Sequence, residues 1–167
     1  MDQVQAQVMA QALRGAGIDF AAWVPDSALR RLGEELATDA AFTLARVWNE
    51  GDGLAVCAGA WLVGRLPALI MEDSGLFASV FAIEGVANRF GVPTLLLISY
   101  RGDALDPRNN WVLAQYALRV EEVLRALDVK YHVVAHAADV KSSVAGAVSY
   151  MRAALKPAAL LLTGELL

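Results

Sequence analysis

The segment GVPTLLLISYRG, residues 91–102, sets an apolar run between a glycine–proline turn and an arginine–glycine turn. The run covers residues 93–99 and is the most apolar of several short runs along the chain. Such short, continuous runs are expected of parallel strands that are buried under helices on both faces of a sheet. The segment therefore predicts an α/β fold.

Helical patterns alternate with these runs on both sides of the segment. The predicted strands are residues 18–24, 42–48, 66–71, 93–99, 130–134 and 158–162. The predicted helices are residues 3–13, a helix from the 25–27 turn to residue 36, and residues 50–64, 74–90, 111–127 and 139–154. No linker interrupts the series, so we expect residues 1–167 to form a single domain. Its core would be one doubly wound, mostly parallel sheet of about six strands with helices on both faces.

The composition restricts the class of protein. Hydrophobic residues make up 57% of the chain and charged residues 19%, against typical values of about 45–50% and about 25%, which excludes disorder. The longest uncharged stretch of the apolar middle, residues 53–64, has 12 residues, whereas a membrane-spanning helix needs about 20. We therefore assign the surplus apolar surface to an obligate interface with another protein.

The charge and the cysteine content exclude further classes. The net charge is −4 and the basic residues form no cluster, which argues against nucleic acid as a partner. Cys57 is the single cysteine, and the first residues do not resemble a signal peptide, so we expect a cytoplasmic protein. Cys57 itself is expected to be a buried, inert thiol.

Ligands of doubly wound sheets bind beyond the carboxyl ends of the strands. The corresponding turns here are residues 25–27, 49–51, 72–75 and 100–103. Neither GxxxxGK[ST] nor GxGxxG follows a strand, and GxSxG is absent, which argues against a nucleotide cradle and against a serine hydrolase. His132 and His136 lack a third ligand nearby, so no metal site is expected in this chain.

Glu50 lies where an apolar strand meets a tightly packed helix, between Asn49 and Gly51. In one interpretation it is a helix-start carboxylate that free backbone N–H groups stabilise. In the other interpretation, desolvation raises the pKa of the Glu50 carboxyl while the helix end lowers it. An acid with its pKa set between these two effects can exchange a proton with a heteroaromatic nitrogen. The residues of this turn alone leave both interpretations open.

Four motifs and two flanking segments carry a family resemblance. The motifs are NEG (residues 49–51), AGA (58–60), MEDSGL (71–76) and the 91–102 segment, and the flanking segments are VPDS (24–27) before them and KPAALLL (156–162) after them. Together they resemble the pyrimidine-binding domain of thiamine-diphosphate-dependent decarboxylases. The resemblance is greatest to sulfopyruvate decarboxylase alpha subunits and to the amino-terminal half of phosphonopyruvate decarboxylase.

The resemblance implies roles for individual residues. The matching glutamate, Glu50, would hydrogen-bond the aminopyrimidine ring of thiamine diphosphate and promote its imino tautomer, which removes the thiazolium proton. The implied cofactor-binding residues are Glu50, Gly51, Ser74, Gly75 and Leu76. Asp73 would be an acid/base group or a helix cap, and Ser27 and Arg101 would contact the substrate, with an Arg101–Asp103 ion pair as the alternative for Arg101.

Two segments of the chain depart from the family pattern. Its members often carry glutamine or asparagine where this chain has Glu72 and Asp73, so an acidic pair would repel a sulfonate or phosphonate here. Relatives on the phosphonopyruvate side carry Gln-His after the Arg-Gly turn, whereas residues 106–110 read DPRNN. The resemblance thus implies a small 2-oxo acid as substrate without fixing which one.

A Gly-Asp-Gly at residues 51–53 looks like the start of the family's magnesium and diphosphate motif. The next asparagine, Asn88, follows Gly53 by 35 residues, which is too far for that motif, and we interpret the match as coincidence. A beta subunit would then supply the diphosphate and Mg²⁺ site, in a hetero-oligomer with an even number of subunits. The alternatives are a non-catalytic scaffold or regulatory subunit, and a subunit of a carboligase or oxidoreductase that uses the same cofactor.

Overall fold

A computed structural model describes residues 1–167 and contains one six-stranded sheet. Its strands are β1 (Phe20–Trp23), β2 (Thr43–Arg46), β3 (Pro67–Glu72), β4 (Leu95–Ser99), β5 (Lys130–Val134) and β6 (Ala158–Leu162). The strand order is β2-β1-β3-β4-β6-β5, and every neighbouring pair is parallel. The predicted α/β fold with about six strands is confirmed.

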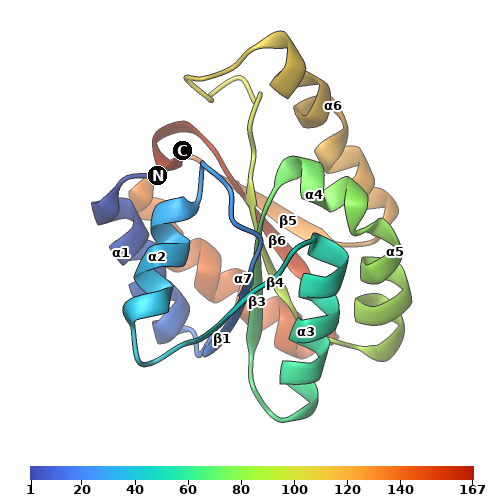
Figure 1. Cartoon of the computed structure of the whole chain (residues 1–167). Helices are drawn as coiled ribbons and strands as arrows, with labels where there is room; N and C mark the ends of the chain where they lie inside the picture. The colour runs from blue at the N-terminus through green and yellow to red at the C-terminus, as the bar shows by residue number, and fades with distance from the viewer.

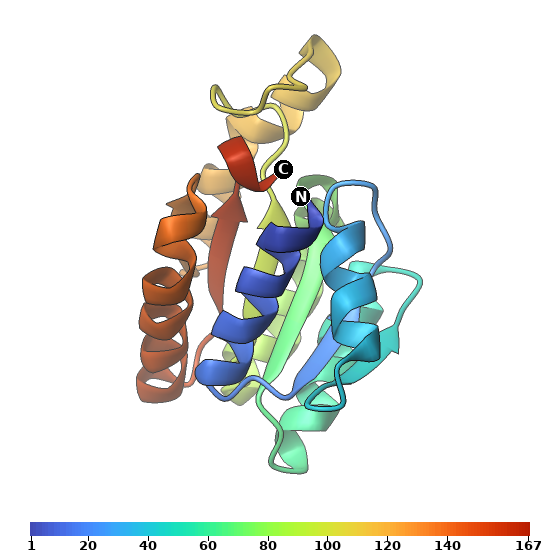
Figure 2. The same ribbon diagram turned by 90° about the vertical axis from the view of Figure 1, so that its left-hand side faces the viewer.

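Helices cover both faces of the sheet (Figure 1). One layer holds α1 (Gln3–Gly15), α2 (Arg30–Thr38) and α7 (Val140–Ala154), with α1 between the other two, as Figure 2 shows. The opposite layer holds α3 (Glu50–Leu62), α4 (Asp73–Ala78), α5 (Val80–Ala82), η1 (Ile83–Asn88) and α6 (Trp111–Ala126). Short 3-10 turns, η2 (Ala137–Asp139) and η3 (Gly164–Leu166), complete the chain.

The alternation of side chains along β4 explains its continuous apolar run. Leu95 and Leu97 belong to the core under α1, α2 and α7, whereas Leu96 and Ile98 belong to the core under α3 and α6. All five residues of β4 are buried, because a central parallel strand has no face that contacts solvent.

The helix predicted for residues 74–90 is interrupted, and in this the prediction is wrong. The chain forms α4, the short α5 and then the π-helix η1. Ser79 is fully buried at the first break, and its hydroxyl donates to the Leu76 carbonyl oxygen at 3.1 Å. A serine that bonds back to the preceding turn competes with the backbone ladder and bends helices. Strands β1 and β2 are also shorter than predicted, at four residues each.

The sheet has a topological switch point at β1 and β3. From β1 the chain crosses to β2 through α2 on one face, and from β2 it returns to β3 through α3 on the other face. Doubly wound sheets bind ligands beyond the carboxyl ends of the strands at such a switch point, so the ends of β1 and β3 are where a ligand site is expected. None of the helices has the length and apolar character that a membrane crossing requires.

Leu97→Ala tests the double-sided core. Leu97 is fully buried, so the substitution should lower the free energy of unfolding by about 2–5 kcal/mol. Leu118→Ala on α6, where the side chain is 64% exposed, should change it by no more than about 0.5 kcal/mol. Urea denaturation followed by circular dichroism measures both; equal losses would contradict the assignment of β4 to the centre of the core.

Candidate functional site

Glu50 is the first residue of α3. The Asn49 side chain caps this helix by accepting a hydrogen bond from the Asp52 backbone N–H at 2.8 Å. The helix thus begins where the sequence predicts, and Glu50 is half-buried in its first turn. Asp52 also lies in this turn, where the positive end of the helix dipole favours carboxylates.

The Glu50 side chain lies directly against Gly75, in the space that a side chain at position 75 would fill. A Cβ atom on Gly75 would overlap the Cγ, Cδ and Oε1 atoms of Glu50, so the carboxylate rests directly on the bare backbone of α4. Gly75 is buried, and any larger residue there would displace the acid. The structure therefore brings together Glu50 and Gly75, which are 25 positions apart in the sequence.

The other predicted cofactor-binding residues lie around this contact. Ser74 precedes Gly75, and its hydroxyl lies 3.3 Å from Glu72 Oε2. Gly51 follows Glu50, and a Cβ on it would meet only Asn49 Oδ1 at 3.3 Å and Ala82 at 3.9 Å. The Leu76 side chain is fully buried in the core under α4, so it supports this turn from the inside.

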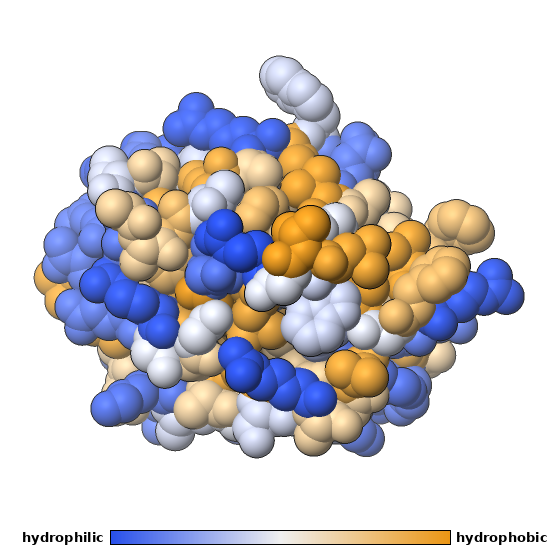
Figure 3. Space-filling view, turned by 90° about the horizontal axis from the view of Figure 1, so that it is seen from below, coloured by the Kyte–Doolittle hydropathy of each residue, from blue (hydrophilic) through white to orange (hydrophobic).

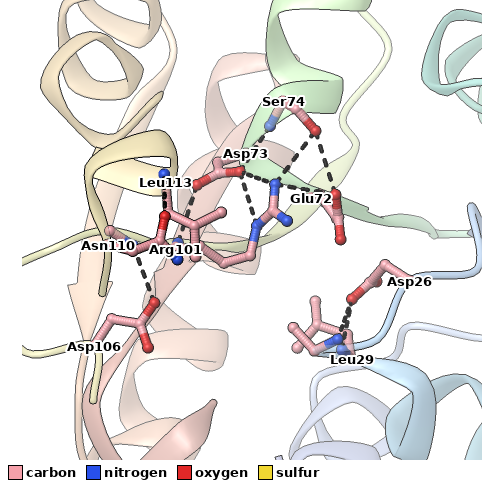
Figure 4. A network of polar contacts seen from close by, with 11 residues as sticks. Asp26, Leu29, Glu72, Asp73, Ser74, Arg101, Asp106, Asn110 and Leu113 are labelled. Atoms are coloured by element: carbon pink, nitrogen blue, oxygen red, sulfur yellow. Dashed lines mark hydrogen bonds and ion pairs between the residues drawn. The ribbon is translucent and has the colours of Figure 1, made fainter. Parts of the chain in front are cut away.

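Asp73 and Arg101 form an ion pair at the ends of β3 and β4 (Figure 4). Asp73 Oδ1 accepts from Arg101 Nη2 at 2.6 Å and from Nε at 3.1 Å, while Oδ2 accepts from the Arg101 backbone N–H at 3.0 Å. Arg101 Nη2 also lies 3.0 Å from Glu72 Oε2. Burial raises the pKa of Asp73, and the Arg101 guanidinium opposes that rise.

These contacts correct one expectation and refine another. The alternative in which Arg101 pairs with Asp103 is wrong, because Asp103 instead accepts from the Thr163 hydroxyl at 3.1 Å. Asp73 does bind a backbone N–H at the start of α4, that of Ser74 at 2.8 Å. Its main partner, however, is Arg101, which sequence analysis did not identify.

Asp26, in the turn after β1, is a member of the site that was not among the predicted site residues. Its Oδ1 accepts from the backbone N–H groups of Ala28 at 2.6 Å and Leu29 at 2.8 Å, just before α2. Its Oδ2 is buried without a hydrogen-bond partner. Figure 4 shows Asp26, in the turn after β1, opposite Glu72 at the end of β3.

The surroundings of Asp26 act on its charge. Burial raises the pKa of Asp26, and the nearby Glu72 carboxylate raises it further, while the two backbone N–H groups and Arg101 act in the opposite direction. The adjacent Ser27 is exposed on the same turn. The one available signal in the sequence was an aspartate in the turn after the first strand, and it did not reveal that Asp26 faces Glu72.

The remaining candidates lie away from this site. Cys57 is fully buried, its thiol donates to the Ala68 carbonyl oxygen at 3.4 Å, and burial raises its pKa to about 12, which makes it an inert thiol. His132 lies on the edge strand β5, and His136 follows that strand. Histidine, cysteine and acidic side chains nowhere gather in a set of three that could hold a metal ion.

Comparison with curated proteins gives several relatives. The sulfopyruvate decarboxylase subunit alpha of Methanocaldococcus jannaschii is 34% identical over 107 residues, which cover 60% of this chain and 63% of the relative. The subunit from Methanothermobacter thermautotrophicus is 29% identical over 134 residues, 79% of each chain. Phosphonopyruvate decarboxylase of Streptomyces hygroscopicus is 31% identical over 99 residues, 59% of this chain and 25% of the relative. No protein-family model matches the chain.

Solved structures share the fold. A chain described as a thiamin diphosphate-dependent enzyme from Mycobacterium smegmatis superposes with a TM-score of 0.73 at 18% identity, over 95% of this chain and 30% of that one. The 2-oxoglutarate:ferredoxin oxidoreductase of Magnetococcus marinus gives 0.69 at 15% identity, over 97% and 29%.

The resemblance stated from the sequence motifs is thereby confirmed. The chain is homologous to sulfopyruvate decarboxylase alpha subunits and to phosphonopyruvate decarboxylase, and its fold matches domains of thiamine-diphosphate-dependent enzymes. The match spans less than two thirds of the length of the Methanocaldococcus and Methanococcus alpha subunits.

Asp26→Asn tests the electrostatics of the site. Because the pKa of Asp26 is raised in the folded state, its contribution to stability is fully present below the unfolded pKa of about 3.9 and is lost as the pH rises through the folded pKa. The asparagine keeps the Oδ1 acceptor and carries no charge. The unfolding free energy of the variant minus that of the wild type should therefore increase between pH 3 and pH 7, on the order of 1 kcal/mol per unit of pKa shift.

Urea titrations at several pH values measure this difference. Asp139→Asn, which removes an exposed carboxylate at the start of α7 that makes no side-chain cap bond, is the matched control. A difference that falls as the pH rises would show that the pKa of Asp26 is lowered in the folded state.

Proposed function

We propose that this chain is the alpha-type subunit of a split thiamine-diphosphate-dependent 2-oxo acid decarboxylase, with Glu50 as the residue that activates the cofactor. The observation that carries the proposal is the contact of the Glu50 carboxylate with Gly75 at the carboxyl end of the sheet. The homology to sulfopyruvate and phosphonopyruvate decarboxylases supports the same reaction class.

The residues around Glu50 fit a flat heteroaromatic ring. Gly75 leaves room for the Glu50 carboxylate itself, and Gly51 beside it carries no side chain that would keep a planar group away from the backbone. Glu50 is half-buried, so it is partly desolvated while one side remains open to a ligand. Glu50, Gly51, Ser74 and Gly75 would hold the aminopyrimidine, with Leu76 packed beneath them.

Each of these residues has a physical task in the reaction. When bound, thiamine diphosphate supplies the electron sink that accepts the electron pair released with carbon dioxide. The Glu50 carboxyl would hold and move a proton at the pyrimidine ring nitrogen, and the Gly75 contact would fix the direction of that carboxyl. Asp73, as a buried carboxylate at the start of α4, would position the turn that carries Ser74 and Gly75, with an acid/base role as the alternative.

A second chain would complete the cofactor site. The proposed beta subunit binds the diphosphate and Mg²⁺, and the site lies between the subunits of a hetero-oligomer. Exposed apolar side chains support such a partner: Trp48 is 97% exposed two residues before Glu50, and Phe81 is 86% exposed on α5. Figure 3 shows a separate apolar patch on the lower face, where α3 ends, at the amino ends of the strands and away from Glu50. Exposed apolar patches of this kind mark protein interfaces.

Glu50→Gln tests the proposed role directly. The amide keeps the shape of the side chain and loses the exchangeable proton, so kcat/KM of the complex reconstituted with the beta subunit should fall by about 100-fold or more. Glu122→Gln, an exposed position on α6 that pairs with Arg119 at 2.9 Å, is the matched control and should retain full activity. Size-exclusion chromatography should show both complexes intact. Undiminished carbon dioxide release by the Glu50 variant would remove this residue from the mechanism.

Phe81→Asp tests the apolar face as the contact with the beta subunit. A buried, unpaired carboxylate at a central contact should weaken association by about 2 kcal/mol or more, roughly 30-fold in Kd. Val4→Asp on α1, where the valine is 67% exposed on the opposite layer, controls for the added charge. Sedimentation of the co-purified complex over a dilution series measures both dissociation constants. Equal values for the two variants would place the partner on another face.

A further inference from the structure

The guanidinium of Arg101 is already occupied by the chain's own carboxylates. Its Nε and Nη2 both donate to Asp73 Oδ1, and Nη2 also pairs with Glu72 Oε2 at 3.0 Å. The Arg101 side chain is only 14% exposed, and the Asp73 side chain is fully buried. Charge-assisted hydrogen bonds of this kind are among the strongest that side chains form.

Release of Arg101 toward a bound anion would be costly. The move would leave Asp73 buried without its counter-ion, and an uncompensated buried charge is strongly destabilising. The Arg101 backbone N–H also binds Asp73 Oδ2 at 3.0 Å, which fixes the start of the β4–α6 loop. The guanidinium is therefore held in place by both its side chain and its backbone.

The surroundings of Arg101 are acidic. Asp26, Glu72 and Asp73 all act on this single guanidinium. The amino-terminal ammonium of Met1, which also interacts with Asp26, donates to the Ala28 carbonyl oxygen at 3.2 Å. The nearby Arg108 pairs with Asp106 at 3.3 Å and adds no free positive charge. Ser74 connects this cluster to the cofactor-activating acid, because its hydroxyl lies 3.4 Å from Arg101 Nη2 and the next residue, Gly75, contacts Glu50.

We infer that Glu72 and Asp73 determine substrate specificity by withholding Arg101 from the substrate, so that the site accepts small 2-oxo acids with an uncharged distal group and discriminates against those with a sulfonate or phosphonate. This inference rests on the proposed decarboxylase function. It separates this chain from the sulfopyruvate and phosphonopyruvate decarboxylases to which it is homologous. The physical reason is that a second negative charge on the substrate would be desolvated next to Asp26 and Glu72 while the Arg101 guanidinium is already paired with Glu72 and Asp73.

The test compares substrates on the complex with the beta subunit. The wild-type kcat/KM for 3-hydroxypyruvate should exceed that for sulfopyruvate by about tenfold or more. The double variant Glu72→Gln/Asp73→Asn keeps both side-chain shapes and removes the two negative charges that pair with Arg101. It should raise the ratio of sulfopyruvate to 3-hydroxypyruvate kcat/KM by about tenfold, mainly through a lower KM for sulfopyruvate.

Glu34→Gln/Glu35→Gln is the matched control. It removes two negative charges from α2, where Glu34 pairs with Arg30 and Glu35 accepts from the Gln3 side chain. It should leave the ratio of the two kcat/KM values unchanged. A wild-type complex that prefers sulfopyruvate, or a ratio that the site variant does not change, would overturn the inference.

A binding measurement on the chain itself separates this inference from the proposed function. The Arg101 Nε–Hε signal in a nuclear magnetic resonance spectrum, identified by its loss in Arg101→Lys, is titrated with sulfoacetate. The wild-type signal should not shift, whereas the signal of the Glu72→Gln/Asp73→Asn variant should shift and saturate. Saturable binding at wild-type Arg101 would overturn the inference. If the wild-type complex decarboxylates no 2-oxo acid, the proposed function fails, and the titration still decides whether Arg101 is withheld from anions.

Discussion

The ion pair of Asp73 and Arg101 holds the carboxyl end of the sheet together. It joins the first turn of α4, which follows β3, to the loop that follows β4. Gly102, the next residue, has a φ of +80°, and a Cβ on it would overlap the Leu113 backbone at the start of α6. The ion pair thus joins the turn that carries Gly75, which lies under the Glu50 carboxylate, to the loop that leads into α6.

The strands could be predicted from sequence because burial on both faces leaves a simple trace, a short apolar run between polar turns. The interruption between α4 and η1 could not be predicted, since Ser79 breaks the helix through a bond to Leu76 that depends on its being buried. The start of α3 at Glu50 was predictable because an asparagine cap and a following acidic turn are local signals. Local interactions could thus be predicted from the sequence, whereas interactions that depend on tertiary packing could not.

The site shows the same division. Motifs in the sequence located Glu50, Ser74 and Gly75, but only the fold shows that the Glu50 carboxylate lies on Gly75. The partner of Arg101 was mistaken because Asp103 is its near neighbour in sequence, whereas Asp73 is its neighbour across β3 and β4. Asp26 reaches the site because β1 lies beside β3 at the switch point, and strand order cannot be derived from one apolar run.

The two acidic functions of the site lie on different sides of the sheet. Glu50 begins α3, which covers the face that includes Leu69 and Met71, whereas Ala68 and Ile70 point to the other core. Glu72 follows Ala68 and Ile70 at two-residue spacing along β3, so its side chain lies on the same side of the sheet as α2 and Asp26. Under the proposed function, the group that acts on the cofactor ring and the charges that would meet the substrate are therefore carried by separate elements. Substitutions at the end of β3 could then change the accepted substrates without altering Glu50, so homology to sulfopyruvate decarboxylase alpha subunits is compatible with the acidic cluster of Asp26, Glu72 and Asp73.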